Sequence, residues 1–277
     1  MSVRAAFAAA VALVMTGCAT TAVTPSAPGD PLGASTAGAP DMRVCSQVPE
    51  DPTVQPTERQ RQARVRLGLG SGYLREGAHE IALRELRTSL ELDPDLAEAH
   101  GAMALLLNAL GKTTEAAQAH REALARAPSN PELHNNYGVF LCQHGELEQA
   151  DAQFRCALAN PLYSTPAAAY ANAADCALRA NRPDRARQDL ESALLVAPDF
   201  LPARLQLAQL LLDQGDAATA LRQYRRYVDR AEPTAASLAL GVRIARAAGD
   251  EDRAASYALR LRDRFPHSDE AFDLDTP

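Results

Sequence analysis

The sequence predicts an all-α protein made of six helix pairs, and three observations carry this prediction. The chain is 47% hydrophobic but only 5% aromatic, with no Trp, and its apolar residues are mostly Ala and Leu. Ala and Leu favour helices, whereas β-branched and aromatic residues favour strands. A small residue recurs about every 34 residues, with an Ala at a fixed distance after it. A proline then closes each period, and helices end before prolines.

The first seventeen residues are typical of a bacterial signal peptide. Arg4 supplies a positive region, and residues 5–14 form an apolar stretch too short to span a bilayer. Met-Thr-Gly-Cys at 15–18 resembles the lipobox, in which a lipid is attached to the cysteine after the preceding peptide is removed. We therefore expect a lipoprotein signal peptide over 1–17 and lipidation of Cys18. An ordinary secretory signal with a chance cysteine is the alternative.

A flexible tether is expected to follow over 18–57, beginning at the lipidated cysteine. This segment is rich in Pro, Ala and Thr and has no periodic apolar pattern, so it cannot bury enough surface to become ordered. Residue 19 is Ala, whereas lipoproteins retained at the inner membrane commonly carry Asp there. The likeness to lipoproteins therefore implies a lipid-anchored protein on the periplasmic face of the outer membrane.

The repeat is defined by its turns, its alanines and its prolines. A turn that needs a positive φ selects Gly first and Asn next, and the turn residues are Gly77, Gly111, Gly145, Asn181, Gly215 and Gly249. Alanines that let two helices approach closely are Ala82, Ala116, Ala150, Ala186, Ala220 and Ala254. The closing prolines are Pro94, Pro128, Pro161, Pro198, Pro233 and Pro266. One interval is two residues longer, which predicts a longer loop around 160–166 that could divide the array into halves.

This pattern resembles the tetratricopeptide repeat, whose period of 34 carries W-x2-L-G-x2-Y, then A-x3-F, then P. The first repeat contains Leu69-Gly70 and Tyr73, and the third contains Tyr137-Gly138 and Phe154. The Trp position is occupied by Arg66, His100, His134, Tyr170, Arg204 and Leu238. The resemblance implies a right-handed superhelix of six tetratricopeptide (TPR) helix pairs over 58–277, with a concave groove.

In tetratricopeptide folds the first helix of each pair lines the groove, and positions 5, 9 and 12 of the repeat share one helix face. The early repeats place there our candidate partner-binding residues Leu67, Ser71, Leu74, Leu105, Asn108, Asn135 and Val139. The late repeats place there Ala171, Asp175, Leu178, Leu205, Gln209, Leu212, Ala239, Arg243 and Arg246. An apolar stripe with scattered amides suits a hydrophobic or amphipathic peptide. The alternative is that several of these leucines form core between repeats.

We expect no catalytic residue, cofactor, metal or small-molecule substrate. Neither H-E-x-x-H, G-x-S-x-G nor a P-loop occurs, and the glycine-rich run at 68–72 falls inside an expected helix. His100 and His134 share the Trp position, which favours structural roles. The cysteines beyond Cys18 show no C-x2-C spacing, which argues against zinc. A disulfide between repeats three and four and buried free thiols remain open alternatives for them. The net charge of −7 argues against a nucleic-acid partner.

The lipobox, the tether, the six repeats and the run Leu-x-Asn-Asn-Tyr-Gly-x-Phe-Leu at 133–141 together resemble the type IV pilus biogenesis lipoproteins of the PilF/PilW family, the pilotins. The segments at 67–74, 161–163 and 240–257 share the resemblance, which covers about 60–270. It implies a protein that binds subunits of the pilus secretin through its early repeats and escorts them to the outer membrane, where they multimerise.

Two other interpretations are weighed against this one. The first is a TPR adaptor lipoprotein of another envelope machine, such as the β-barrel assembly complex, although that protein resembles five repeats and not six. The second is an envelope enzyme whose repeats recruit substrate. It needs a catalytic domain, and no segment outside the repeats, the signal and the tether is long enough to form one.

Overall fold

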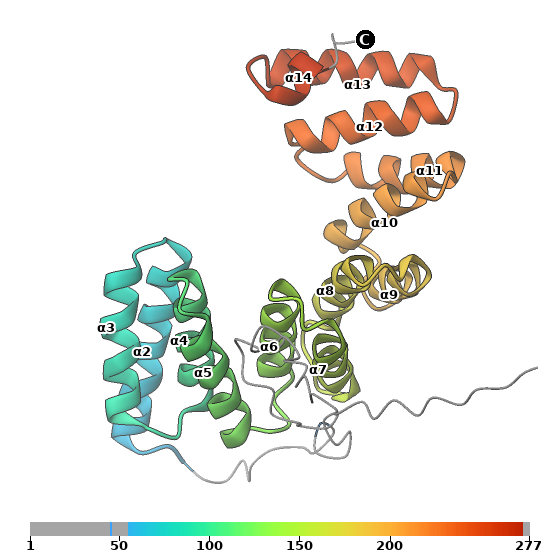
Figure 1. Ribbon diagram of the computed structural model, residues 1–277. Helices are drawn as coiled ribbons and strands as arrows, with labels where there is room; N and C mark the ends of the chain where they lie inside the picture. The colour runs from blue at the N-terminus through green and yellow to red at the C-terminus, as the bar shows by residue number, and fades with distance from the viewer. Residues whose placement is uncertain (1–44, 46–54, 274–277) are drawn as a thin grey trace, which may run out of the picture. The chain divides into compact units, whose positions relative to one another are not determined.

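Cys45 and residues 55–273 are described by the computed structural model, and the regular elements of these residues are all α-helices (Figure 1). The expected signal peptide, Cys18 and almost all of the expected tether lie outside the described residues. The first long helix, α2, begins at Glu58, where the sequence predicts the start of the repeats.

Twelve of the helices form six consecutive antiparallel pairs, which confirms the predicted all-α TPR architecture. A five-residue helix, α14 (Asp269–Asp273), follows the last pair. The pairs are α2 (Glu58–Arg75) and α3 (His79–Leu92); α4 (Ala97–Ala109) and α5 (Thr113–Arg126); α6 (Pro131–Gln143) and α7 (Leu147–Ala159); α8 (Pro166–Arg179) and α9 (Pro183–Val196); α10 (Leu201–Asp213) and α11 (Ala217–Val228); α12 (Ala235–Ala247) and α13 (Glu251–Arg264).

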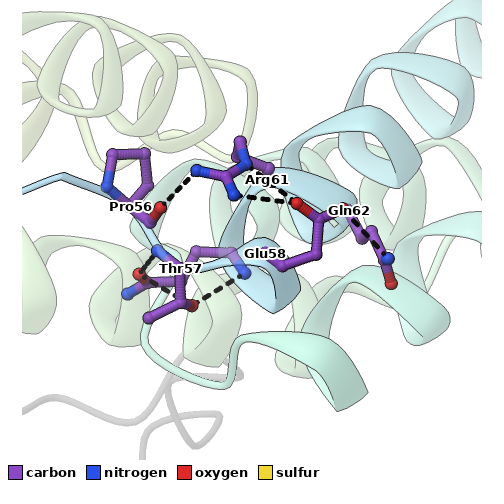
Figure 2. Close-up of polar contacts among 6 residues, drawn as sticks. Pro56, Thr57, Glu58, Arg61 and Gln62 are labelled. Carbon is purple, nitrogen blue, oxygen red and sulfur yellow. Dashed lines mark hydrogen bonds and ion pairs between the residues drawn. The ribbon is translucent and has the colours of Figure 1, made fainter.

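A capping box starts the first repeat (Figure 2). The Gln60 backbone N–H donates to Thr57 Oγ1 at 3.3 Å, and the Thr57 N–H donates to Gln60 Oε1 at 2.8 Å. Arg61 donates to the carbonyl oxygen of Pro56 at 2.7 Å and also pairs with Glu58. These bonds satisfy N–H groups that have no partner inside the helix, so α2 begins at a defined residue.

The turn inside each pair has the geometry that the sequence predicts. All six small turn residues have positive φ, from 56° at Asn181 to 85° at Gly145. The N–H of the next residue then donates to the carbonyl five residues earlier, as from Ala78 to Tyr73 at 2.9 Å and from Arg182 to Ala177 at 2.8 Å. This bond satisfies a carbonyl at the end of the first helix. Gly and Asn are therefore required here by backbone conformation.

Close approach of the two helices explains the other small residues of the repeat. The six repeated alanines are buried, five of them completely. Opposite them, Gly138 faces the Phe154 ring so closely that a Cβ at Gly138 would lie 2.8 Å from a ring carbon. Gly70 faces Leu86 in the same way, at 2.7 Å. In repeats one and three the pair is thus held together by a large side chain that fills the space left by a small one.

Neighbouring pairs stack through their first helices, since α2, α4, α6, α8, α10 and α12 each contact the next in the series. The predicted longer loop is present at 160–165, but it does not divide the array. The second helix of repeat three, α7, packs directly on α8 of repeat four, and the described residues form one compact unit. A continuous buried cluster then runs through repeats four to six, from Ala167 to Ala271.

The residues at the Trp position are structural, as predicted for the two histidines. His134 Nδ1 lies 2.6 Å from Gln153 Oε1 on α7, and its Nε2 lies 2.8 Å from the carbonyl oxygen of Pro128. His100 and Arg204 bond in the same way to the carbonyl of the proline six residues before them. A polar side chain therefore replaces the indole ring and links the helix pair to the preceding loop.

We expect Gly138→Ala to destabilise the protein by about 1–3 kcal/mol, because the added methyl group overlaps the Phe154 ring in a filled interior. Gly72→Ala is the matched control: it adds the same methyl group inside α2, where nothing lies within 4 Å. There the gain in helix propensity, about 0.5–1 kcal/mol, should dominate. Urea unfolding followed by circular dichroism measures both changes. Equal effects of the two substitutions would contradict the proposed close packing.

Candidate functional site

A groove lies on the first helices of the last three repeats. It has a volume of about 530 Å³, in the range of ligand-binding clefts. Most of its wall is apolar, from side chains on α8, α10 and α12 together with Leu190 of α9. The apolar residues are Ala174, Leu178, Leu190, Leu205, Leu210, Ala236, Ala239 and Leu240. We call this surface the late groove.

The late groove contains six of the nine late-repeat positions that the sequence assigns to the concave face. They are Asp175, Leu178, Leu205, Gln209, Ala239 and Arg243. The other three, Ala171, Leu212 and Arg246, do not line it. The helical register of the repeat is therefore sufficient to predict which face of these three helices is hollowed.

Acidic groups outnumber basic ones around the late groove. Its charged lining consists of Asp175, Asp213 and Glu270 against the single cation Arg243. Arg243 Nη2 lies 3.9 Å from Asp213 Oδ1, and this aspartate also accepts a hydrogen bond from Gln209 at 2.7 Å. Glu270, on α14, makes no ion pair within the described residues. The rim therefore has a net negative charge.

The candidate residues of the early repeats fall into two groups. Leu67 and Leu74 are half-buried and pack against the clusters between the first two repeats, as the core alternative proposes. Leu105 is 38% exposed on α4. Ser71 and Val139 are half-buried, so they remain candidates for a contact surface.

Two of the predicted groove amides, Asn108 and Asn135, form hydrogen bonds with neighbouring repeats. Asn108 on α4 donates to Gln143 Oε1 at 3.2 Å, and its Oδ1 lies 3.1 Å from His144 Nε2. Asn135 is 8% exposed and accepts a hydrogen bond from Asn172 of repeat four at 3.0 Å. We therefore assign Asn135 first to the junction between repeats three and four.

All four described cysteines are paired, so the buried-thiol alternative is wrong for them. Cys142 on α6 is bonded to Cys176 on α8, which is the disulfide between repeats three and four that the sequence left open. The second bond, Cys45 to Cys156 on α7, joins residues 111 positions apart and was not anticipated. Its Cys156 sulfur lies 3.1 Å from His134 Nε2. Because these two sulfurs are oxidised, the Cys45–His134–Cys156 cluster offers no thiolate to a metal.

One histidine has a strongly altered pKa, and its surroundings are structural. His120 on α5 is buried, and its ring centroid lies 5.1 Å from those of both Tyr137 and Phe140 on α6. Burial without a compensating partner lowers its pKa from 6.5 to about 4. No nucleophile or carboxylate accompanies it, so it joins repeats two and three as a neutral aromatic group.

The stacked pairs and the groove on their first helices define a TPR binding scaffold, and comparisons with known proteins agree. The tetratricopeptide repeat family matches residues 67–131, and again residues 107–159 and 177–244. The chain is 31% identical over 268 residues to "Type IV pilus assembly protein PilF" of Pseudomonas aeruginosa, covering 97% of this chain and 96% of that protein. It therefore belongs to the PilF/PilW family of type IV pilus TPR proteins.

Solved structures give the same result. The structure of Pseudomonas aeruginosa PilF matches with a TM-score of 0.70 at 31% identity, covering 79% of this chain and 98% of that one. PilW, described as a widely conserved type IV pilus biogenesis factor, matches with a TM-score of 0.70 at 29% identity, covering 76% and 97%. No helix among the described residues is long and apolar enough to cross a bilayer.

We expect stability to fall as the pH drops from about 6.5 to about 4. Folded His120 stays neutral in this window while the unfolded chain binds a proton there, so protonation favours unfolding. At about 1.36 kcal/mol per pKa unit, the loss attributable to His120 is about 3 kcal/mol. His120→Phe keeps an aromatic ring but should lose this component, whereas the exposed His267→Phe should keep it. The free energy of unfolding of the wild type and of both variants is measured at pH 7 and pH 4. An equal dependence on pH in all three proteins would contradict the role of His120.

Proposed function

We propose that this protein is a pilotin: an outer-membrane lipoprotein that binds subunits of the type IV pilus secretin and promotes their localisation and multimerisation. The observation that carries the proposal is the similarity to a type IV pilus assembly protein over 97% of the chain. Because this similarity extends beyond the repeats, it includes the segment with the expected signal peptide and Cys18. The protein acts as a binding scaffold and not as an enzyme.

The first two repeats carry the apolar surface that such a role requires. Four large apolar side chains there are exposed: Val65 at 63%, Leu69 at 43%, Leu105 at 38% and Leu110 at 41%. Burying each against a partner contributes about 1.5–3 kcal/mol at most. A secretin subunit exposes apolar surface before its ring closes, and this part of the scaffold would hold that surface until assembly.

In this proposal the lipid determines the membrane to which the bound subunit is delivered. Several acyl chains on Cys18 anchor the scaffold stably, where a single chain would bind only marginally. A bound subunit then travels with the lipoprotein to the outer membrane. The adaptor for another envelope machine, the alternative considered above, has less support, since the Pseudomonas aeruginosa relative and PilW are both named for type IV pili.

A strain lacking the protein should lose secretin multimers, or retain them in the inner membrane. Envelope fractionation followed by semi-denaturing gels locates them. Restoring the wild-type gene should restore outer-membrane multimers. Restoring the gene with the Cys18→Ser substitution should give a repeat domain that folds but does not bring secretin multimers to the outer membrane, because the lipid is absent. Normal outer-membrane multimers in the deletion strain would refute the pilotin role, and normal multimers with Cys18→Ser would refute lipid escort.

Leu105→Glu should weaken secretin binding about tenfold or more, since a charge then replaces an apolar contact on the partner surface. The matched control is Leu195→Glu on α9, where the side chain is already 81% exposed and lies outside the first two repeats and the late groove. Binding is measured with purified secretin subunits, and circular dichroism checks the fold. If Leu105→Glu instead lost helicity, Leu105 would belong to the core. If both variants bound like wild type, the early repeats would not be the contact surface.

A further inference from the structure

The late groove contains a buried hydrogen-bond acceptor that nothing satisfies. Gln206 lies on α10 in its wall, and its Oε1 atom is buried without a partner. Most buried polar atoms in proteins have a partner, and leaving one unpaired costs about 1–3 kcal/mol. A bound molecule that donates an N–H group would remove this cost. The atom is buried, so a donor in the groove reaches it only after the Gln206 side chain turns toward the groove; the unpaired atom is compatible with a ligand that carries donors.

The charge of the rim adds a second requirement. Asp175, Asp213 and Glu270 surround an apolar wall, and Arg243 offsets only one of them. Asp175 is itself paired with Arg179 at 3.0 Å, which leaves Glu270 as the least neutralised carboxylate. Lys or Arg side chains complement such a rim, whereas acidic ligands are repelled.

The size of the late groove limits the length of the ligand. Its wall is formed by three successive first helices, and packed helices lie about 8–10 Å apart. The span of about 16–20 Å equals about five or six residues of extended chain at about 3.3 Å each. Leu178 on α8, which is 40% exposed, and Leu205 on α10 offer apolar contacts along this span.

We propose that the late groove binds a short extended segment of a partner protein that combines apolar side chains with Lys or Arg. Its apolar side chains contact Leu178 and Leu205, and its cation lies near Glu270. The chain's own terminal segments do not fit this description. Residues 19–54 contain four acidic residues and one Arg, and residues 274–277 contain one Asp and no basic residue. The proposal is independent of the secretin role.

A random peptide library displayed on phage, panned against the full-length protein in mild detergent, tests it. We expect the enriched peptides to combine apolar residues with Lys or Arg. An enriched peptide, labelled with a fluorophore, should bind Leu178→Arg about tenfold or more weakly by anisotropy, since the substitution adds bulk and positive charge. Leu195→Arg, the same change at an exposed position outside the groove, should bind like wild type.

Glu270→Lys supplies a second test that does not alter the apolar wall. Panning against this variant should select fewer Lys and Arg residues, because the rim then carries two cations and two aspartates. The proposal fails if panning enriches no peptide, if the enriched peptides are acidic, or if they bind Leu178→Arg as tightly as wild type. The test contains no secretin, so its failure leaves the pilotin proposal standing and the reverse also holds.

Discussion

The close approach of two helices within each pair is the constraint on which the rest of this protein depends. Ala at one fixed position brings the two helices together, and in repeats one and three a Gly leaves space that a Leu or Phe side chain fills, as with Gly138 and Phe154. A single pair still leaves its outer faces apolar, so it is stable only when another pair covers them. The distance between the two helices of a pair therefore sets the distance between successive pairs. This in turn places the first helices next to one another.

Much of this architecture could be predicted from the sequence, because the same backbone or packing requirement recurs at the same position in each of the six repeats. Asn181 is the clearest example: it departs from Gly yet shares the positive φ, as the chemistry of αL residues requires. The hollowed face of the late repeats also followed from helical register. What the pattern could not give were features that occur once. The Asn135–Asn172 bond and the unpaired Gln206 depend on how two particular repeats meet, and the pairing of Cys45 depends on a segment outside the repeat.

The two ends of the array offer surfaces of different character. The first two repeats expose apolar side chains such as Val65 and Leu69. The last three repeats enclose a groove with an acidic rim and a buried acceptor. A broad apolar surface suits a folded partner, whereas a narrow groove with defined polar groups suits a short segment. Under the two proposals above, one scaffold built from a single repeat would have two specificities, set by the side chains that the repeat leaves free.

The Cys45–Cys156 bond also determines how mechanical load passes through the chain. It closes a covalent ring over residues 45–156, which holds repeats one and two and most of repeat three. A pull on the chain ahead of Cys45, opposed by a partner held at the late repeats, passes through the sulfur bridge directly into α7. The first two repeats then lie outside the line of tension, and the Cys142–Cys176 bond links α6 to α8 in parallel with the backbone. An attached load would then leave the first two repeats folded while the chain is under stress.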